Sequence, residues 1–262
     1  MKSRIAFVTC YFNPCNYQKR LANYWEFLNK WDKRVPLITV QHRGVKLHQS
    51  VIYFEQGEPY IWQKERLLNL GAWQLLEYDY IGYVDADIIL NDGWYSRLER
   101  LVELHPVVRN FTSPASQGLS WVFRRDFWTD IGLYERCVVG GADRYMYYGL
   151  LGQNIPRTTQ YLKHDYNRWC EKYHKYSDGT FIAVGGNTIE QLPHGRLENR
   201  CYDTRHAKIK RFDSSFHVQT IVNGPLTWSQ DCPGSIKDIV KNYFIERYED
   251  DEGRRCCSSP IG

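Results

Sequence analysis

The stretch YIGYVDADIIL, residues 80–90, reads as a buried β-strand that carries two aspartates near its end. Asp85 and Asp87 are separated by one residue, so their side chains point to the same side of an extended chain. A buried carboxylate needs a partner, because it otherwise loses its hydration without compensation. The pair therefore predicts a site for one divalent cation that holds a phosphorylated ligand. The alternative is a strand end at which both aspartates enter the solvent and cap a loop.

Strand and helix patterns alternate on both sides of this stretch. Apolar runs at residues 5–9, 35–40, 51–54 and 107–111 predict strands, and apolar residues at helical spacing predict helices that begin near residues 18, 63, 94 and 235. This order favours an α/β fold with a mixed, mostly parallel central sheet flanked by helices. Ligands of such sheets bind outside the carboxyl ends of the strands. Asp85, Tyr11 and Asn13 fall at those ends.

Composition narrows the class of protein. The net charge of +4 in 262 residues is too small to indicate a nucleic-acid protein by itself. Because the chain has no apolar run long enough to span a bilayer and no export signal, we expect no membrane insertion and a cytoplasmic location. The eight cysteines lack C-x-x-C spacing, which argues against a zinc knuckle and a secreted disulfide scaffold, so we expect mostly reduced thiols.

With Lys64 and Asn69 in the helix that precedes it, the Asp-Ala-Asp motif resembles that of the nucleotide-sugar glycosyltransferases of the GT-A fold. Residues 118–135, GLSWVFRRDFWTDIGLYE, are similar to the family-2 pattern in which an acceptor loop precedes an FRR segment. The stretch GGADR, residues 140–144, stands where many inverting members carry Glu-Asp. The resemblance implies that Asp143 is the general base, although Ala142 replaces the usual Glu. From the residues alone, Asp143 is equally a helix N-cap.

A late histidine completes the resemblance. The stretch QLPHGR, residues 191–196, is similar to the segment that carries a metal-binding histidine in β-1,4-galactosyltransferases, with Gln191 in place of their Met. It implies that Asp85, Asp87 and His194 hold the metal. Carboxylate oxygens with one imidazole suit Mn²⁺, or less strongly Mg²⁺. A loop histidine with no special task is the alternative for His194.

The resemblance also implies a site for the sugar donor and a division of the chain into two halves and a C-terminal part. We expect a single domain, 1–262, with a nucleotide-sugar-binding half at about 1–112, an acceptor-binding half at about 113–230, and a C-terminal helix and tail at about 231–262. The residues expected to contact a nucleoside-diphosphate sugar, preferably a UDP-sugar, are Thr9, Tyr11, Asn13, Lys64, Arg66, Asn69, Asp85, Ala86 and Arg196.

The implied activity is metal-dependent transfer of a sugar to a hydroxyl acceptor, with inversion. The acceptor is either a glycan or lipid-linked intermediate, or a hydroxymethylated pyrimidine in phage-type DNA. For DNA, the basic segment 196–211 and the aromatic segment 157–176 would form the docking surface, although a solvated face and helix packing explain them as well. A sugar nucleotidyltransferase and a non-catalytic sugar- or nucleic-acid-binding module are the alternatives from other classes.

Overall fold

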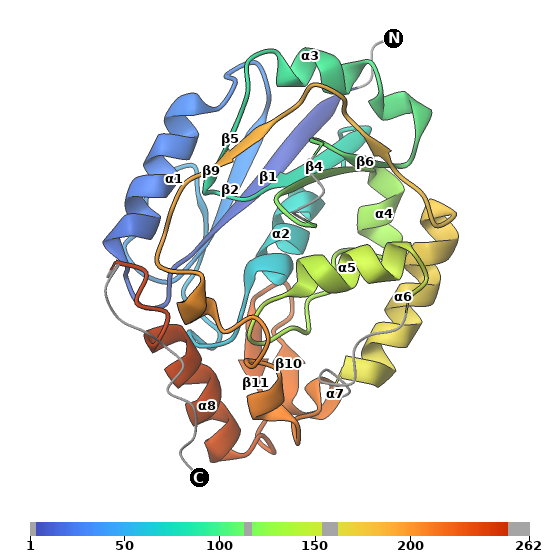
Figure 1. Ribbon diagram of the computed structural model, residues 1–262. Helices are drawn as coiled ribbons and strands as arrows, with labels where there is room; N and C mark the ends of the chain where they lie inside the picture. Colours follow the sequence, from blue (N-terminus) through green and yellow to red (C-terminus); the bar gives the residue numbers. More distant parts are fainter. Residues whose placement is uncertain (1–3, 113–116, 154–161, 251–262) are drawn as a thin grey trace.

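The computed structural model describes residues 4–112, 117–153 and 162–250. Within them, seven strands form a central sheet in the order β3-β2-β1-β4-β7-β6-β8 (Figure 1). These strands are β1 (Ile5–Phe12), β2 (Leu37–His42), β3 (Ile52–Phe54), β4 (Tyr80–Val84), β6 (Val107–Arg109), β7 (Ser120–Arg124) and β8 (Ile182–Ala183). β7 runs antiparallel to β4 and β6, whereas the other neighbours are parallel. This confirms the mixed, mostly parallel α/β sheet.

Two further strand pairs lie outside the central sheet. β5 (Ile88–Leu90) pairs with β9 (Ile189–Gln191), and β10 (Val218–Thr220) pairs with β11 (Leu226–Trp228), both antiparallel. The β5–β9 pair brings the segment after residue 191 next to the end of β4. The Leu192 amide donates a hydrogen bond to the Asp87 carbonyl at 2.7 Å. Residues more than 100 positions apart in the chain therefore meet at the Asp-Ala-Asp motif.

Helices cover both faces of the sheet. They are α1 (Gln18–Lys30), α2 (Lys64–Ala72), α3 (Trp94–Glu99), α4 (Arg125–Asp130), α5 (Ala142–Leu150), α6 (Lys163–Ser177), α7 (Ser214–His217) and α8 (Gly234–Ile245). Short 3₁₀ turns occupy Trp73–Leu75, Val102–Leu104, Glu198–Arg200 and Ala207–Ile209. Side chains of β1 alternate between the faces: Ile5 and Phe7 join a cluster with α1 and α3, whereas Ala6 and Val8 join a cluster with α2.

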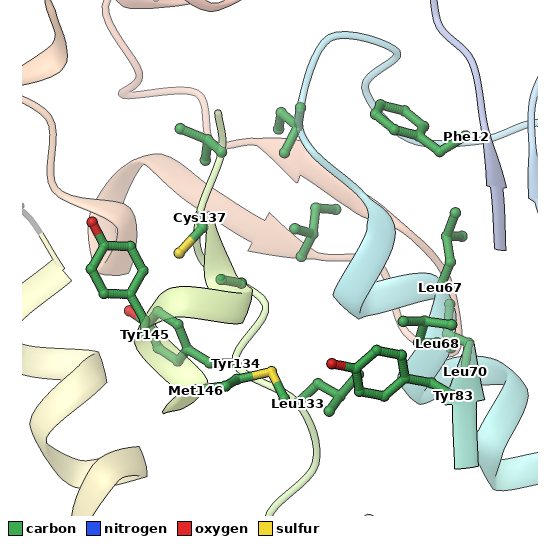
Figure 2. Packing of buried hydrophobic residues seen from close by; sticks show 14 of the residues in the cluster. Phe12, Leu67, Leu68, Leu70, Tyr83, Leu133, Tyr134, Cys137, Tyr145 and Met146 are labelled. Carbon is green, nitrogen blue, oxygen red and sulfur yellow. The ribbon is translucent and has the colours of Figure 1, made fainter. Parts of the chain in front are cut away.

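The larger apolar cluster binds α2 and α5 to the sheet. Figure 2 shows part of it, with Leu67 and Leu68 from α2 and Tyr145 and Met146 from α5. All four side chains are buried. Burial of such side chains contributes about 1.5–3 kcal/mol each. The two helices that carry Lys64 and Asp143 are therefore held by packing, independently of any ligand.

Several expected boundaries were wrong. β1 continues to Phe12, so Tyr11 lies within the strand, and Asn13 follows directly after it. The run 80–90 is not one strand: β4 ends at Val84, and Asp85, Ala86 and Asp87 form the turn before β5. The break occurs because β5 leaves the central sheet to pair with β9.

Both predicted N-caps were also wrong. α8 begins at Gly234 after Pro233, so Ser235 lies inside the helix. α5 begins at Ala142 after Gly141, whose positive φ of 93° suits glycine, so Asp143 is the second residue of the helix and not its cap.

No helix in the described residues has both the length and the apolar character needed to cross a membrane. Of the six cysteines in this part of the chain, five are free thiols, whereas Cys201 is disulfide-bonded. The prediction of mostly reduced thiols therefore holds for these five.

The contact between α2 and the sheet depends on Gly71. A methyl group at this position would overlap the Val8 side chain and lie 2.6 Å from Val40 Cγ2. We expect Gly71→Ala to lower the free energy of unfolding by about 1–3 kcal/mol, even though alanine favours helices by about 1 kcal/mol. Urea denaturation measures this change. Gly185→Ala, whose added methyl meets no atom within 4 Å, is the control; equal stability of the two variants would contradict the packing argument.

Candidate active site

A cleft of about 900 Å³ opens at the carboxyl ends of β1 and β4, where ligands of α/β sheets bind. Loops before α2 and α5, the turn after β4 and the segment 188–206 form its walls. Its charged or titratable lining residues are Cys10, Tyr11, Arg20, Lys64, Asp85, Asp87, Asp143, Arg144, Tyr145, His194, Arg200, Tyr202, Arg205, His206 and Arg247. The cleft thus gathers three carboxylates within a largely basic wall.

Lys64 joins two of these carboxylates. It is the first residue of α2, and its Nζ lies 2.7 Å from Asp85 Oδ1 and 3.1 Å from Asp143 Oδ1. Burial, above all, raises the pKa of Asp85 to about 7, although the neighbouring Lys64 lowers it. Burial likewise disfavours the charge of Lys64, but Asp143 and Asp85 outweigh burial and raise its pKa well above the ordinary value. The lysine therefore remains a cation between two carboxylates.

Asp87 has a different partner. His194 Nε2 lies 2.6 Å from Asp87 Oδ2, and the imidazole is 5% exposed. Burial opposes ionisation of Asp87, but the hydrogen bond and charge of His194 prevail and lower the pKa of the carboxyl. The second imidazole nitrogen, Nδ1, lies 3.4 Å from Glu249 Oε2.

Glu249 connects His194 to helix α1 and to the segment that follows α8. Its buried carboxylate pairs with Arg247 Nε at 2.5 Å and with Arg20 of α1, whose Nη2 donates at 2.9 Å. The next residue, Asp250, accepts hydrogen bonds from the first amides of α1, those of Gln18 and Lys19. The segment after α8 is thus anchored to α1 beside the cleft.

The donor atoms suit a divalent cation, although they contact one another here. Asp87 and His194 supply oxygen and nitrogen, and the buried Asp85 Oδ1 accepts no hydrogen bond, although Lys64 is near. Among residues 4–112, 117–153 and 162–250, no group of three or more His, Cys, Asp or Glu side chains is arranged to hold a metal. Asp87 contacts His194 directly and Asp85 contacts Lys64 directly, so the two aspartates do not face one common cation position. Metal binding thus requires Asp85 to turn from Lys64.

The structure brings some of the expected site residues together in the cleft and leaves others outside it. Tyr11, Lys64, Asp85, Ala86 and Asp87 line the cleft, as do His194 and Asp143. The other five expected residues, Thr9, Asn13, Arg66, Asn69 and Arg196, are not among its lining residues.

These five residues have other contacts or lie in solvent. Thr9 donates to the Val84 carbonyl, Arg66 donates to the Gly224 carbonyl at 2.7 Å, and Asn69 binds the backbone of Leu133. The Asn13 side chain closes the turn before α1 through Tyr17, and Arg196 is exposed. Four of these side chains therefore hold backbone segments together, whereas Arg196 lies in solvent.

The aromatic segment 157–176 does not form the expected docking surface where it is described. Tyr166 and Tyr173 of α6 are 1% exposed and pack in the core, and the Trp169 indole donates to the Gly132 carbonyl. Its first part, 157–161, lies outside the described residues. Of the basic segment 196–211, Arg200 and Arg205 line the cleft together with His206.

Sequence reasoning missed the network around Glu249. Arg20, Trp62 and Arg247 line the cleft, but nothing in their local pattern singles them out. The one available signal is the spacing of Arg247 and Glu249, whose opposite charges two residues apart follow the last amphipathic helix. Such a pair is usually an exposed surface feature, whereas here both side chains are buried.

Solved structures with limited similarity were found. They include TarS from S. aureus (12% identity, TM-score 0.45, 93% of this chain and 71% of that chain) and glucosyl-3-phosphoglycerate synthase from Mycobacterium tuberculosis with Mg²⁺ and UDP (13%, 0.37, 73% and 73%). A third is a Drosophila β-1,4-galactosyltransferase with manganese, UDP-Gal and xylobiose (12%, 0.42, 90% and 98%). No protein-family model and no curated protein matches.

The stability of the protein at low pH tests whether burial and the cleft arginines lower the pKa of His206. Burial, followed by the charges of Arg205 and Arg144, lowers the pKa of His206 from 6.5 to about 3. The unfolded chain therefore binds one more proton between these values, so stability is lost as pH falls below about 6.5. From pH 7 to pH 5, we expect the free energy of unfolding of the wild type to fall by about 2 kcal/mol more than that of His206→Gln. Urea denaturation at both pH values decides this; parallel losses would contradict it.

Proposed function

We propose that the chain is a metal-dependent glycosyltransferase that moves a sugar from a nucleoside-diphosphate sugar, preferably a UDP-sugar, to a hydroxyl acceptor with inversion. One observation carries the proposal: a single cleft at the strand ends contains the Asp87–His194 pair and the Asp85–Lys64–Asp143 group. Carboxylates next to an imidazole suit a cation that holds a diphosphate, and a further carboxylate suits a general base. The GT-A resemblance of the sequence agrees with both roles.

On the donor side, Asp87 and His194 would hold Mn²⁺ or Mg²⁺, with Asp85 as a further ligand. A divalent cation neutralises the diphosphate as the bond to the sugar breaks. Lys64 supports the same task, because its buried ammonium already lies 2.7 Å from the Asp85 carboxylate. It also neutralises Asp85, which burial would otherwise keep protonated.

On the acceptor side, Asp143 would accept the proton of the attacking hydroxyl. Its side chain is 35% exposed, so it reaches the cleft, and Lys64 fixes one of its oxygens at 3.1 Å. The second oxygen remains available to a hydroxyl. A base acting opposite the leaving group gives single displacement and therefore inversion.

We keep one domain, 1–262, with a donor half at about 1–112 and an acceptor half at about 113–230. Asp85, Asp87 and Lys64 come from the donor half and Asp143 from the acceptor half, which also contributes His194 to the donor site. The acceptor is either a glycan or lipid-linked intermediate or a hydroxymethylated pyrimidine in DNA. In duplex DNA, the pyrimidine would have to flip out of the stack to reach Asp143.

Two alternative functions make different predictions. A sugar nucleotidyltransferase would release pyrophosphate, whereas a glycosyltransferase releases the nucleoside diphosphate. A non-catalytic binding module would not need Asp85, Asp87 and Asp143 in one cleft. The conjunction of these carboxylates with Lys64 favours catalysis.

Asp87 tests the donor site. We expect UDP to bind the wild type in the presence of Mn²⁺ and to bind Asp87→Asn at least about tenfold more weakly, because the variant loses a charged ligand. Calorimetry and thermal shift measure binding, with EDTA removing the metal and GDP comparing nucleotides. Asp92→Asn is the matched control, since Asp92 is exposed and lies outside the cleft lining. A folded wild type that binds neither nucleotide would contradict the assignment.

Asp143 tests the catalytic role separately. We expect Asp143→Asn to lower kcat by about 10²–10⁴-fold, because an amide cannot accept the proton, while the affinity for UDP stays within about threefold. Release of UDP from UDP-sugars with candidate acceptors measures the rate. Asp130→Asn, an exposed aspartate at the end of α4, is the control. Undiminished kcat in Asp143→Asn would exclude it as the base.

A further inference from the structure

Five arginines line the cleft: Arg20, Arg144, Arg200, Arg205 and Arg247. Arg144 is exposed, and the other four differ in how their charge is balanced. Arg20 and Arg247 both pair with the buried Glu249. Arg200 and Arg205 are 9% and 7% exposed, yet neither forms an ion pair with a carboxylate of the described residues. In both, Nε is buried without a hydrogen-bond partner. Two buried cations in one cleft thus lack an anion.

The contacts of Arg205 fix its orientation without neutralising it. Its Nη1 donates to the Tyr243 hydroxyl at 3.0 Å, and its guanidinium lies 4.8 Å from the centre of the Tyr202 ring. Arg247 donates to the same Tyr243 hydroxyl at 2.8 Å. Within the described residues, Arg205 Nε is buried without an acceptor, and Nη2 donates no hydrogen bond.

The Nη2 atom of Arg205 lies at the beginning of α5. A methyl group on Gly141 would lie 2.6 Å from Arg205 Nη2, so only the bare glycine backbone leaves room for the guanidinium. No side chain of the described residues caps this nine-residue helix. The Arg144 amide donates to the Gly141 carbonyl at 3.1 Å, whereas the Ala142 and Asp143 amides donate no hydrogen bond within the described residues. These two amides carry the positive end of the helix dipole. Arg144, in the first turn, is exposed at the edge of the same cleft.

A buried arginine without a counter-ion is costly, whereas a guanidinium beside helix amides is well suited to an oxyanion. We propose that Arg205 and the first turn of α5 form a subsite for a phosphate or carboxylate group of the acceptor. That the ligand is an acceptor rests on the proposed function. The subsite itself rests on Arg205 and α5 alone.

The place of the subsite explains its role. Gly141 precedes Asp143 by two residues, so an anion held there keeps its own molecule next to the proposed base. Tyr202 and Leu197 line the same cleft and are 50% and 63% exposed, which leaves their apolar surface for the carbon skeleton of an acceptor. The proposal therefore narrows the acceptor to a hydroxyl compound with an oxyanion near the reacting hydroxyl.

The donor diphosphate is a different anion. Its proposed cation is held at Asp87 and His194, and Arg200 lies at that end of the cleft, because its Nη2 donates to the His194 carbonyl at 3.0 Å. Arg205 instead contacts the helix that carries Asp143. Donor and acceptor anions thus have separate cations, which allows both to bind at once.

Binding of inorganic phosphate tests the subsite without any transfer reaction. By calorimetry, we expect Arg205→Gln to weaken phosphate binding about tenfold and Arg205→Lys to weaken it less, because lysine keeps the charge but loses the two-pronged geometry. Arg211→Gln, an exposed change in the same basic segment, should bind as the wild type does. Circular dichroism checks that each variant is folded, and the lysine variant serves if the glutamine variant is not.

Addition of UDP with Mn²⁺ separates this subsite from the donor site. We expect phosphate to bind the UDP-saturated protein through Arg205. If saturating UDP displaces phosphate, or if Arg205→Gln and Arg205→Lys both bind it as the wild type does, the subsite is overturned. The same calorimetric titration with acetate in place of phosphate distinguishes a carboxylate subsite from a phosphate subsite. If UDP fails to bind but Arg205-dependent phosphate binding persists, the subsite stands and the glycosyltransferase proposal falls.

Discussion

The cleft depends on the need to neutralise two carboxylates at the buried end of β4. Asp85 and Asp87 follow a fully apolar strand, so each requires a cationic or hydrogen-bonding partner from elsewhere in the chain. Lys64, at the start of α2, meets Asp85, and His194, beyond β9, meets Asp87. These two pairs fix how α2 and the β5–β9 pair sit against the end of the central sheet. The cleft is the space that they enclose.

The partner of Asp87 is itself supported from the far end of the chain. His194 contacts Glu249, and Glu249 is held by Arg247 and Arg20. Breaking a buried ion pair by removing one partner typically costs about 3–5 kcal/mol, because the other charge remains buried. Orientation of His194 is therefore linked to the docking of the segment after α8 on α1. Such support from carboxylates behind a histidine is what keeps a ligand-binding imidazole in one position.

The sequence allowed prediction of the parts that depend on local pattern. The run 80–90 indicated a buried strand that carries the aspartates, although the strand ends at Val84, and alternation of strands and helices indicated the sheet. Roles set by tertiary contacts could not be predicted in this way. Arg66 and Asn69 precede the motif in the chain as the resemblance requires. In the structure, however, Arg66 donates to the Gly224 carbonyl and Asn69 donates to the Leu133 carbonyl. Arg20 and Glu249 are 229 residues apart, and no spacing rule connects them.

The arginines of the cleft show why charge counted along a sequence is a poor guide to a site. The segment 196–211 is rich in basic residues, but its exposed members lie in high dielectric, where a lone charge costs little. Arg200 and Arg205 are buried, so the same charge there is destabilising unless an anion meets it. Arg247 is buried as well and has Glu249, which shows that this fold can supply a carboxylate where stability requires one. Arg205 has no carboxylate partner among the described residues, although it is buried at the start of α5, and the proposed oxyanion subsite accounts for this where folding alone does not.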